Sequence, residues 1–592
     1  MELVLVAIHL EASPRAVPLG PAMLASALKR AFPRQLRTRI LDLFLQDSAE
    51  ACAGRILALA PRAVGFSMYV WNRTLALAIA ALLKRADPAI IVFAGGAEAT
   101  ADCLGVQGDP AVDFVLPGEG EELIVAAMGR LLEGAGPEAV RDGLRPAPIG
   151  DLATLASPFL DGTLDPGDYS GQLWELSRGC PFSCDFCFES RGGSGTRRVP
   201  MERVAAELRL FEQRQVAQVF VLDPTFNYDR RQAKEVLRLI RATAPGIHFF
   251  FEIRSEFLDR ELAQLFAGIK CTLQIGLQSA RNEVLRNIGR SMDPADFRRK
   301  ILLLHRAGAT YGFDLIYGLP GDTLEGFQAS LDFALELMPN HLDLFRLSVL
   351  PGTRLRETAA GFGLEHQRHN PYRVLSSPTF SAADLDRAER LAGACDRFYN
   401  QGRAVPWFAL LLAALELTPA QCFAQFADHL DANPPGEITA LQRSFVLEAF
   451  RDRPNPRQGH VAADLATYFG RSGALAEAAP AEPRDGAAGP LRLSPQACFA
   501  AFEHDPEALL DQLGAGITEL EDLSFMLPAR PCEAIVYLHL GEPGVRTLSA
   551  AQAGLLRRVT GGGALDREDA ASREFVQSLI ADGIMISDEA RP

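Results

Sequence analysis

The stretch Ser177-Arg178-Gly179-Cys180-Pro181-Phe182-Ser183-Cys184-Asp185-Phe186-Cys187-Phe188 decides how the rest of the chain is interpreted. Its three cysteines, Cys180, Cys184 and Cys187, have the spacing Cys-x3-Cys-x2-Cys. Thiolates are the usual ligands of iron–sulfur clusters, and a full protein set for a cubane would be four. Three thiols therefore leave one iron with an open coordination position, as catalytic metal sites do.

This stretch resembles the cluster loop of radical S-adenosylmethionine (SAM) enzymes, including the aromatic Phe186 before the third cysteine. The resemblance implies a 4Fe–4S cluster held by the three cysteines, SAM at the open iron, and Phe186 beside its adenine. One electron from the cluster then cleaves SAM to methionine and a 5′-deoxyadenosyl radical. The alternative is a structural zinc loop, which needs a fourth Cys or His. The nearest downstream candidates, His248 and Cys271, lie more than sixty positions away.

Bulk properties limit the partners and the compartment. The 592 residues predict three or four domains. The net charge of -15 argues against nucleic acid as a partner. The cysteines outside the loop are scattered singly, which indicates a reducing compartment. The N-terminus has no basic segment and no apolar run is long enough to span a bilayer, so we expect a cytoplasmic protein without membrane contact.

Residues 1–165 alternate β-rich runs with helical stretches, the pattern of a parallel sheet covered on both faces. Such sheets bind ligands at the carboxyl ends of their strands. The expected strands are 3–8, 37–43, 62–67, 89–95 and 112–116, and the expected helices are near 20–31, 49–59, 73–86 and 119–133. The strand ends carry Ser67, Tyr69, Gly95, Gly96, Gly118 and Glu119.

This region resembles the cobalamin (B12)-binding domain found in front of many radical SAM modules. The resemblance implies that these six strand-end residues contact cobalamin. The Asp-x-His-x-x-Gly element that supplies a lower axial histidine is absent, because His9 lies inside the first strand. We therefore expect the lower face of the corrin to lack a histidine ligand. The alternative is a nucleotide-binding type of sheet whose glycines only make turns.

Residues 166–365 contain six strand–helix units, the number in the open partial barrel of radical SAM enzymes. The expected strands are 172–176, 219–222, 249–253, 272–276, 312–317 and 344–350. Barrels of this kind place catalytic residues at strand carboxyl ends. By resemblance, the SAM contacts are Asp223, Thr225, Glu252, Arg254, Gln278, Ser279, Arg290 and Gly318. Arg254 and Arg290 both suit the SAM carboxylate, since a guanidinium makes bidentate contacts. For any one of these polar residues, a helix cap or a surface ion pair is the alternative.

The last third of the chain has no catalytic motif. Residues 366–473 have helical periodicity, and 474–490, rich in Pro, Ala and Gly, form a predicted linker. Residues 491–592 form a small α+β domain with strands at Ala534–Leu540 and 584–586. Between these strands, a capping box at Ser549 opens one helix and 575–581 forms another, which suggests a winged-helix-like unit.

The resulting fold class is α/β, with a Rossmann-like cobalamin-binding domain, a partial (β/α)6 radical SAM barrel and a mainly helical C-terminal region. The leading hypothesis is a cobalamin-dependent methyltransferase that acts on an unactivated carbon of a small-molecule, natural-product or peptide substrate. Flavodoxin or ferredoxin would supply its electrons. Cyclisation or rearrangement with the same cofactors stays open. An RNA methylthiotransferase would need further N-terminal cysteines, and only Cys52 and Cys103 precede the loop. A non-catalytic cobalamin or redox sensor is the alternative of another class.

Overall fold

The structure, a computed structural model, describes residues 1–189, 195–477, 491–561 and 569–587. The chain divides into two compact units. The first contains Met1–Ser330 and Leu344–Asp386, and the second contains Leu331–Asp343 and Arg387–Pro592. Both regions with cofactor motifs lie in the first unit. The exact boundary between them, predicted after residue 165, stays a prediction.

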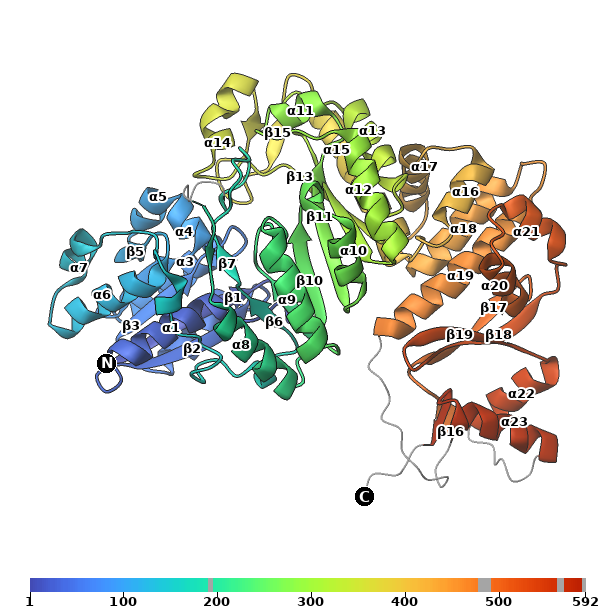
Figure 1. Ribbon diagram of the computed structural model, residues 1–592, viewed down its shortest axis with the longest axis horizontal. Coiled ribbons are helices and arrows are strands. Elements are labelled where there is room, and N and C mark those ends of the chain that lie inside the picture. The colour runs from blue at the N-terminus through green and yellow to red at the C-terminus, as the bar shows by residue number, and fades with distance from the viewer. Residues whose placement is uncertain (190–194, 478–490, 562–568, 588–592) are drawn as a thin grey trace. The chain divides into compact units, whose positions relative to one another are not determined.

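The N-terminal sheet is parallel, with strand order β2-β1-β3-β4-β5. Val4 and Val6 of β1 pack into one apolar cluster, and Leu3 and Leu5 pack into another. Successive strand residues point to opposite faces, so both faces of the sheet are buried under helices, as Figure 1 shows. The strands are β1 (Glu2–His9), β2 (Arg37–Phe44), β3 (Ala63–Ser67), β4 (Ile91–Gly95) and β5 (Phe114–Leu116). The helices are α1 (Leu19–Ala31), α2 (Ala49–Leu57), α3 (Arg73–Ala86), α4 (Ala97–Ala101), α5 (Cys103–Gln107), α6 (Gly120–Leu132) and α7 (Pro137–Gly143).

The second large sheet has the order β13-β12-β11-β10-β9-β6, which confirms the six expected barrel strands. Its strands are β6 (Gln172–Trp174), β9 (Gln218–Val221), β10 (His248–Ile253), β11 (Cys271–Gln278), β12 (Thr310–Tyr317) and β13 (His341–Arg346). Its helices are α8 (Met201–Gln213), α9 (Arg230–Thr243), α10 (Arg260–Ala267), α11 (Asn282–Arg286), α12 (Pro294–Ala307) and α13 (Leu324–Leu335). The last strand ends at Arg346 and not at 350, because Ser348 pairs with Arg373 outside the sheet.

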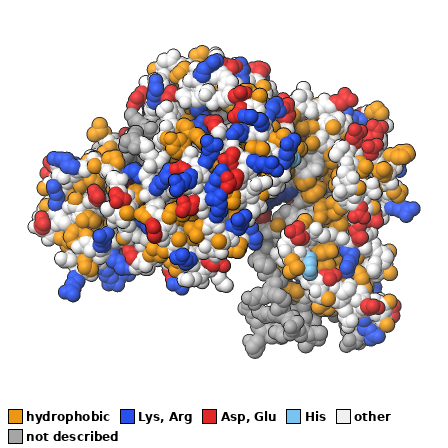
Figure 2. All heavy atoms as spheres, in the orientation of Figure 1, with side chains coloured by type: hydrophobic (Ala, Val, Ile, Leu, Met, Phe, Trp, Pro, Cys, Tyr) orange, Lys and Arg blue, Asp and Glu red, His pale blue; other side chains and the backbone are white. Residues whose placement is uncertain are grey.

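Short elements complete the first unit. The hairpin β7 (Ser177–Arg178) and β8 (Arg197–Arg198) flanks the cysteine loop. The helix α14 (Arg354–Thr358) and the strands β14 (Glu365–His366) and β15 (Val374–Ser376) follow the barrel. On the face shown in Figure 2, basic and acidic side chains interleave over the barrel helices. Lys234 of α9, for example, forms ion pairs with Asp259 at 2.8 Å and Glu261 at 2.7 Å.

The helical region contains α15 (Ala382–Cys395), α16 (Phe408–Leu415), α17 (Pro419–Ala432), α18 (Ile438–Phe450) and α19 (Arg457–Glu477). Helix α19 extends past the predicted linker start at 474, and the rest of that linker, 478–490, lies outside the described residues. In the described ranges, no single helix is long and apolar enough to cross a bilayer, although α16 and α17 pass that test together as a pair bent by 91°.

The C-terminal elements are β16 (Leu491–Leu493), β17 (Ala497–Phe502), α20 (Pro506–Gly514), α21 (Leu520–Met526), β18 (Cys532–His539), β19 (Glu542–Leu548), α22 (Ala550–Thr560), α23 (Ala570–Ala581) and β20 (Met585–Ser587). Ser549 and Gln552 form the expected capping box of α22. The sequence analysis missed the strand β19, which pairs with β18. The winged-helix-like assignment stays a prediction.

Candidate functional site

The cysteine loop begins where a buried carboxylate fixes the backbone. Asp223, just after β9, accepts hydrogen bonds at Oδ1 from the backbone amides of Leu176 and Ser177, both at 3.0 Å. Its Oδ2 accepts a third bond from Ser177 Oγ at 2.7 Å. Burial raises the pKa of Asp223 to about 6, although these hydrogen bonds oppose the shift. The side chain therefore holds the start of the loop, and its predicted contact with SAM stays untested.

The middle of the loop is fixed by two segments distant in sequence. The amide of Asp185 donates to the Ile288 carbonyl at 3.0 Å, and the Asp185 carbonyl accepts from the Leu355 amide at 2.8 Å. Gly289 lies so close that a Cβ there would stand 2.8 Å from the Ser183 carbonyl oxygen. With a φ of +69° as well, this position requires glycine. The loop is thus held by the segment that follows α11 and by the first turn of α14.

The three predicted ligand thiols lie on this loop within electrostatic range of one another. Burial raises the pKa of Cys180, with a further contribution from the charge of Cys184. Burial also raises the pKa of Cys187 to about 11, and the charges of Cys184, Glu189 and Cys180 add to it. Iron has to displace these protons, since only thiolates act as ligands.

The loop offers three thiols, one fewer than the four protein ligands of a structural zinc ion. No three Cys, His, Asp or Glu side chains in the described ranges gather around one metal position. A structural zinc ion needs its ligands on one tetrahedron, whereas each thiolate of a cubane binds a different iron and stands farther from the others.

A cavity of about 580 Å³ opens beside the loop, and two of the predicted SAM residues, Arg254 and Arg290, line it together with Phe182 and Glu256. The Arg254 guanidinium lies 3.9 Å from the centre of the Phe182 ring and pairs with Glu256 at 2.5 Å. Arg290 donates to the Gly276 carbonyl at 2.7 Å. Burial and the charge of Arg254 lower the pKa of Arg290, which makes an anionic ligand favourable here.

The other predicted SAM residues are spread over the ends of the barrel strands. Gln278 sits at an irregularity of β11 with a φ of +66°. Its buried Oε1 has no hydrogen-bond partner among the residues described, so it offers an acceptor to a ligand. Ser279 lies beside it, 3.3 Å from Ser330 Oγ, and Glu252, at the end of β10, is exposed. Although its side chain is exposed, the protein atoms around Glu252 displace part of its hydrating water, and this desolvation raises its pKa.

Three predicted contacts have local roles in the structure. Thr225 Oγ1 donates to the neighbouring Pro224 carbonyl at 2.7 Å. Gly318 has a φ of +82°, and a Cβ there would stand 2.8 Å from Val374 Cγ1. Phe186 is half-buried on the loop. Their contacts with SAM stay predictions.

The edge of the N-terminal sheet predicted to bind cobalamin has open backbone and a flat aromatic pair. Gly96 has a φ of +96°, and a Cβ there would stand 2.8 Å from the Met68 carbonyl oxygen. Gly118 has a φ of +82°, and a Cβ there would meet nothing within 4 Å. Tyr69 stacks on Trp71 with 4.5 Å between ring centres. The open face of Gly118 and the flat aromatic pair fit a macrocycle that approaches the backbone closely, whereas Gly96 is required by its contact with Met68.

Two polar residues of this edge are engaged within the protein. His9 Nε2 lies 2.7 Å from Asp42 Oδ1, and Asp42 also accepts from the Tyr169 hydroxyl at 3.0 Å. The absence of a histidine ligand on the lower face of the corrin stays a prediction. Asn72, fully buried, accepts from the Tyr69 amide at 2.8 Å and donates to the Ser67 carbonyl at 3.0 Å. The sequence analysis missed Asn72, which shapes the loop that carries Tyr69.

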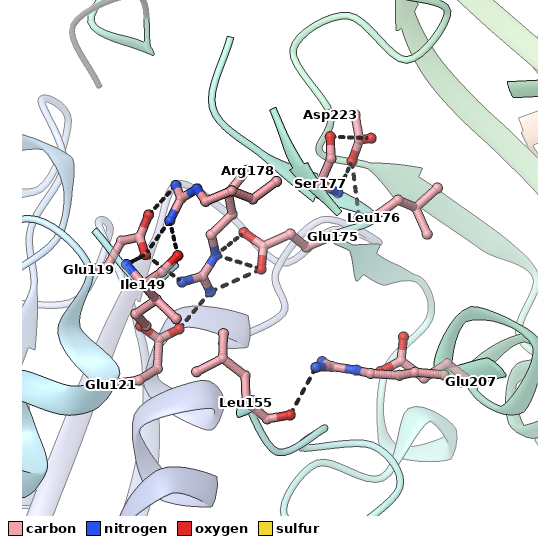
Figure 3. Close-up of polar contacts among 12 residues, drawn as sticks. Glu119, Glu121, Ile149, Leu155, Glu175, Leu176, Ser177, Arg178, Glu207 and Asp223 are labelled. Carbon is pink, nitrogen blue, oxygen red and sulfur yellow. Dashed lines mark hydrogen bonds and ion pairs between the residues drawn. The ribbon is translucent and has the colours of Figure 1, made fainter. Parts of the chain in front are cut away.

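Glu119, predicted to contact cobalamin, has its carboxylate turned toward Arg178 in β7, the strand that leads into the cysteine loop (Figure 3). It pairs with Arg197 at 2.5 Å and accepts from the Ile149 amide at 2.8 Å. Burial alone would raise the pKa of Glu119, but these hydrogen bonds and the charge of Arg178 lower it. Its role at the corrin stays a prediction.

Arg178, Arg197 and Glu121 were not predicted as one group, because only the fold brings them together.

Known proteins match the two parts of the first unit separately. The Radical SAM superfamily matches residues 174–334, and the B12 binding domain matches residues 6–128. The cobalamin-dependent radical SAM methyltransferase TokK of Streptomyces tokunonensis is 28% identical over 330 residues, 50% of this chain and 48% of that protein. The 2-(S-pantetheinyl)-carbapenam-3-carboxylate methyltransferase of Streptantibioticus cattleyicolor is 28% identical over 370 residues, 54% of this chain and 52% of that protein.

The chain therefore spans about half the length of these curated relatives. Among solved structures, the cobalamin-dependent S-adenosylmethionine radical enzyme OxsB with aqua-cobalamin bound has a TM-score of 0.52 at 14% identity, with 79% of each chain covered. That likeness supports the fold alone. One family model matches each part of the first unit, so the chain carries a B12 binding domain in front of a radical SAM domain.

Proposed function

We propose that the protein is a cobalamin-dependent radical SAM methyltransferase that acts on an unactivated carbon of a small molecule. The observation that carries this proposal is the combination, in one compact unit, of a three-cysteine loop with an open glycine edge on a parallel sheet. Two relatives named as methyltransferases are similar to 50% and 54% of this chain. When bound, the cluster supplies the electron that cleaves SAM, and cobalamin supplies the methyl group.

Different residues of the chain are proposed to hold the cluster, SAM and cobalamin. Cys180, Cys184 and Cys187 would hold the cluster, and a set of three thiolates would leave one iron open to SAM. Arg254 and Arg290 offer cationic groups to the SAM carboxylate beside the loop. At the sheet edge, Gly118 would let the corrin approach the backbone, and Gly96 lets the turn pack against Met68. Methyl transfer needs the methyl group and the substrate carbon within near-contact distance.

The test is anaerobic turnover with SAM that carries a labelled methyl group. The reconstituted protein would be reduced by flavodoxin or ferredoxin, supplied with cobalamin and incubated with small molecules from neighbouring biosynthetic steps. We expect a labelled product together with S-adenosylhomocysteine and 5′-deoxyadenosine in about equal amounts, one of each per methyl transferred. The absence of any SAM cleavage would contradict the proposal and favour a sensor.

A second candidate, cyclisation or rearrangement, uses the same cofactors. It predicts 5′-deoxyadenosine without S-adenosylhomocysteine. Among solved structures, the cobalamin-dependent S-adenosylmethionine radical enzyme OxsB resembles 79% of this chain and the methyltransferase TsrM 62%, a likeness of fold that leaves both candidates open. The ratio of the two nucleoside products distinguishes the candidates.

A further inference from the structure

Two arginines face each other at the neck of the cysteine loop. Arg178 of β7 and Arg197 of β8 are cross-strand partners, and the loop with its three cysteines lies between these strands. Like charges directly opposite on a strand pair destabilise it. The hairpin that closes the cysteine loop therefore needs counter-charges in order to form.

Those counter-charges come largely from the B12-binding part of the chain. Arg178 Nη2 lies 2.5 Å from Glu121 Oε1, and Arg178 Nη1 lies 3.5 Å from Glu119 Oε2. The Arg197 guanidinium donates from Nη2 to Glu119 Oε1 at 2.5 Å and from Nη1 to Glu119 Oε2 at 2.9 Å. Glu175, beside the loop itself, adds a contact of 2.9 Å to Arg178. Figure 3 shows the Arg178 guanidinium directed at the carboxylates of Glu121 and Glu175.

The contacts are shielded from water. The side chains of Arg178 and Glu121 are 12% and 7% exposed. A buried charge that loses its partner is costly, whereas exposed ion pairs contribute little. A group of this kind tolerates few alternative geometries, because every donor and acceptor has to be satisfied at once. We therefore expect the group to fix the position of the β7–β8 hairpin relative to the start of α6, which an exposed ion pair would not do.

Both predicted cofactor sites lie within a few residues of this group. Glu119 directly follows Gly118, whose open face belongs to the predicted corrin edge, and Glu121 lies in the first turn of α6. Arg178 lies two residues before Cys180. From the barrel side, Asp223 binds the neighbouring Ser177. The ion-pair group therefore connects the turn at the predicted corrin edge to Arg178, which lies two residues before the first predicted cluster ligand, Cys180.

We propose that Glu119, Glu121, Arg178 and Arg197 are positioning residues that set the separation between the iron–sulfur cluster and the corrin. This inference rests on the proposed function, because it concerns the distance that methyl transfer requires. It assigns to Glu119 and Glu121 a role toward the cysteine loop. Nothing in the contacts of these carboxylates requires them to touch either cofactor.

The test measures this separation in holoprotein without relying on turnover. The reduced cluster and cob(II)alamin each carry one unpaired electron, so their magnetic interaction reports their distance by electron paramagnetic resonance. The variants are Glu121→Gln and Arg178→Lys. Glu122→Gln is the matched control, because Glu122 lies on the same helical turn and is exposed. Iron, sulfide and corrin per chain are measured in every sample.

We expect wild type and Glu122→Gln to show the same interaction, and Glu121→Gln and Arg178→Lys to show a weaker, broader one with cofactor content unchanged. S-adenosylhomocysteine formation should then fall by about 10²-fold for a displacement near 1 Å, while 5′-deoxyadenosine formation persists. An unchanged interaction in both variants would overturn the inference. Loss of a cofactor from both would also overturn it, because the group would then retain cofactors and not space them. A wild type with both cofactors but no interaction would contradict the proposed function itself.

Discussion

Replacing Gly96 by alanine tests the shape of the predicted corrin edge. Gly96 has a φ of 96° and a ψ of -179°, a conformation that is essentially restricted to glycine and costs other residues about 1–3 kcal/mol. In addition, the new Cβ would stand 2.8 Å from the Met68 carbonyl oxygen and 3.1 Å from its amide nitrogen. Overpacking of this kind typically costs a further ~1–3 kcal/mol. We therefore expect Gly96→Ala to lower the free energy of unfolding by about 2–6 kcal/mol.

The assay is urea unfolding of the cofactor-free protein followed by circular dichroism, together with titration of hydroxocobalamin. The control is Gly54→Ala in α2, where a Cβ would meet nothing within 4 Å. Alanine is a better helix former than glycine by about 0.5–1 kcal/mol, so this control should be neutral or stabilising. Wild-type stability and wild-type corrin binding in Gly96→Ala would refute the reasoning about this edge.

Three further substitutions test the cysteine loop and its surroundings. Cys184→Ala should lose the iron and sulfide that the half-buried control Cys103→Ala retains, as measured per chain after anaerobic reconstitution. Asp223→Ala leaves three donors of Leu176 and Ser177 without their acceptor; at ~1–3 kcal/mol for each unsatisfied buried group, the unfolding midpoint should fall clearly, and an unchanged midpoint would contradict the assigned contact. Because Glu119 has a lowered pKa, its stabilising contribution is present above the ordinary value of 4.5 and is lost as the pH falls through the folded-state value. The stability difference between wild type and Glu119→Gln, measured on cofactor-free protein, should therefore be large at pH 7 and shrink below pH 4.5, and a difference independent of pH would contradict it.

Much of the fold is predictable because parallel strands buried on both faces are continuously apolar. The strand at Leu3–Ile8 follows from that pattern. The barrel strands β10 and β11 instead alternate buried residues with less buried ones. The assignment of the cysteine triad as a cluster site rests on spacing and resemblance and stays a prediction. The end of β13 does not, because the bridge between Ser348 and Arg373 depends on a segment that folds back later in the chain.

The ion-pair group at the loop neck could not be predicted for the same reason. Glu119 and Arg178 are 59 positions apart, since 178 minus 119 is 59. Each has an unremarkable local sequence, so their meeting is a property of the packed unit. The same holds for Gln278, whose orphaned Oε1 results from a strand irregularity that no periodicity reveals.

The most direct test of the account is the electron paramagnetic resonance spectrum of the reduced, reconstituted protein before and after SAM is added. Three cysteine ligands and an open iron predict a 4Fe–4S signal that changes when SAM binds, and that is missing from Cys184→Ala. A signal that ignores SAM, or one that survives the loss of Cys184, would contradict the claim that this loop holds an incompletely ligated cluster.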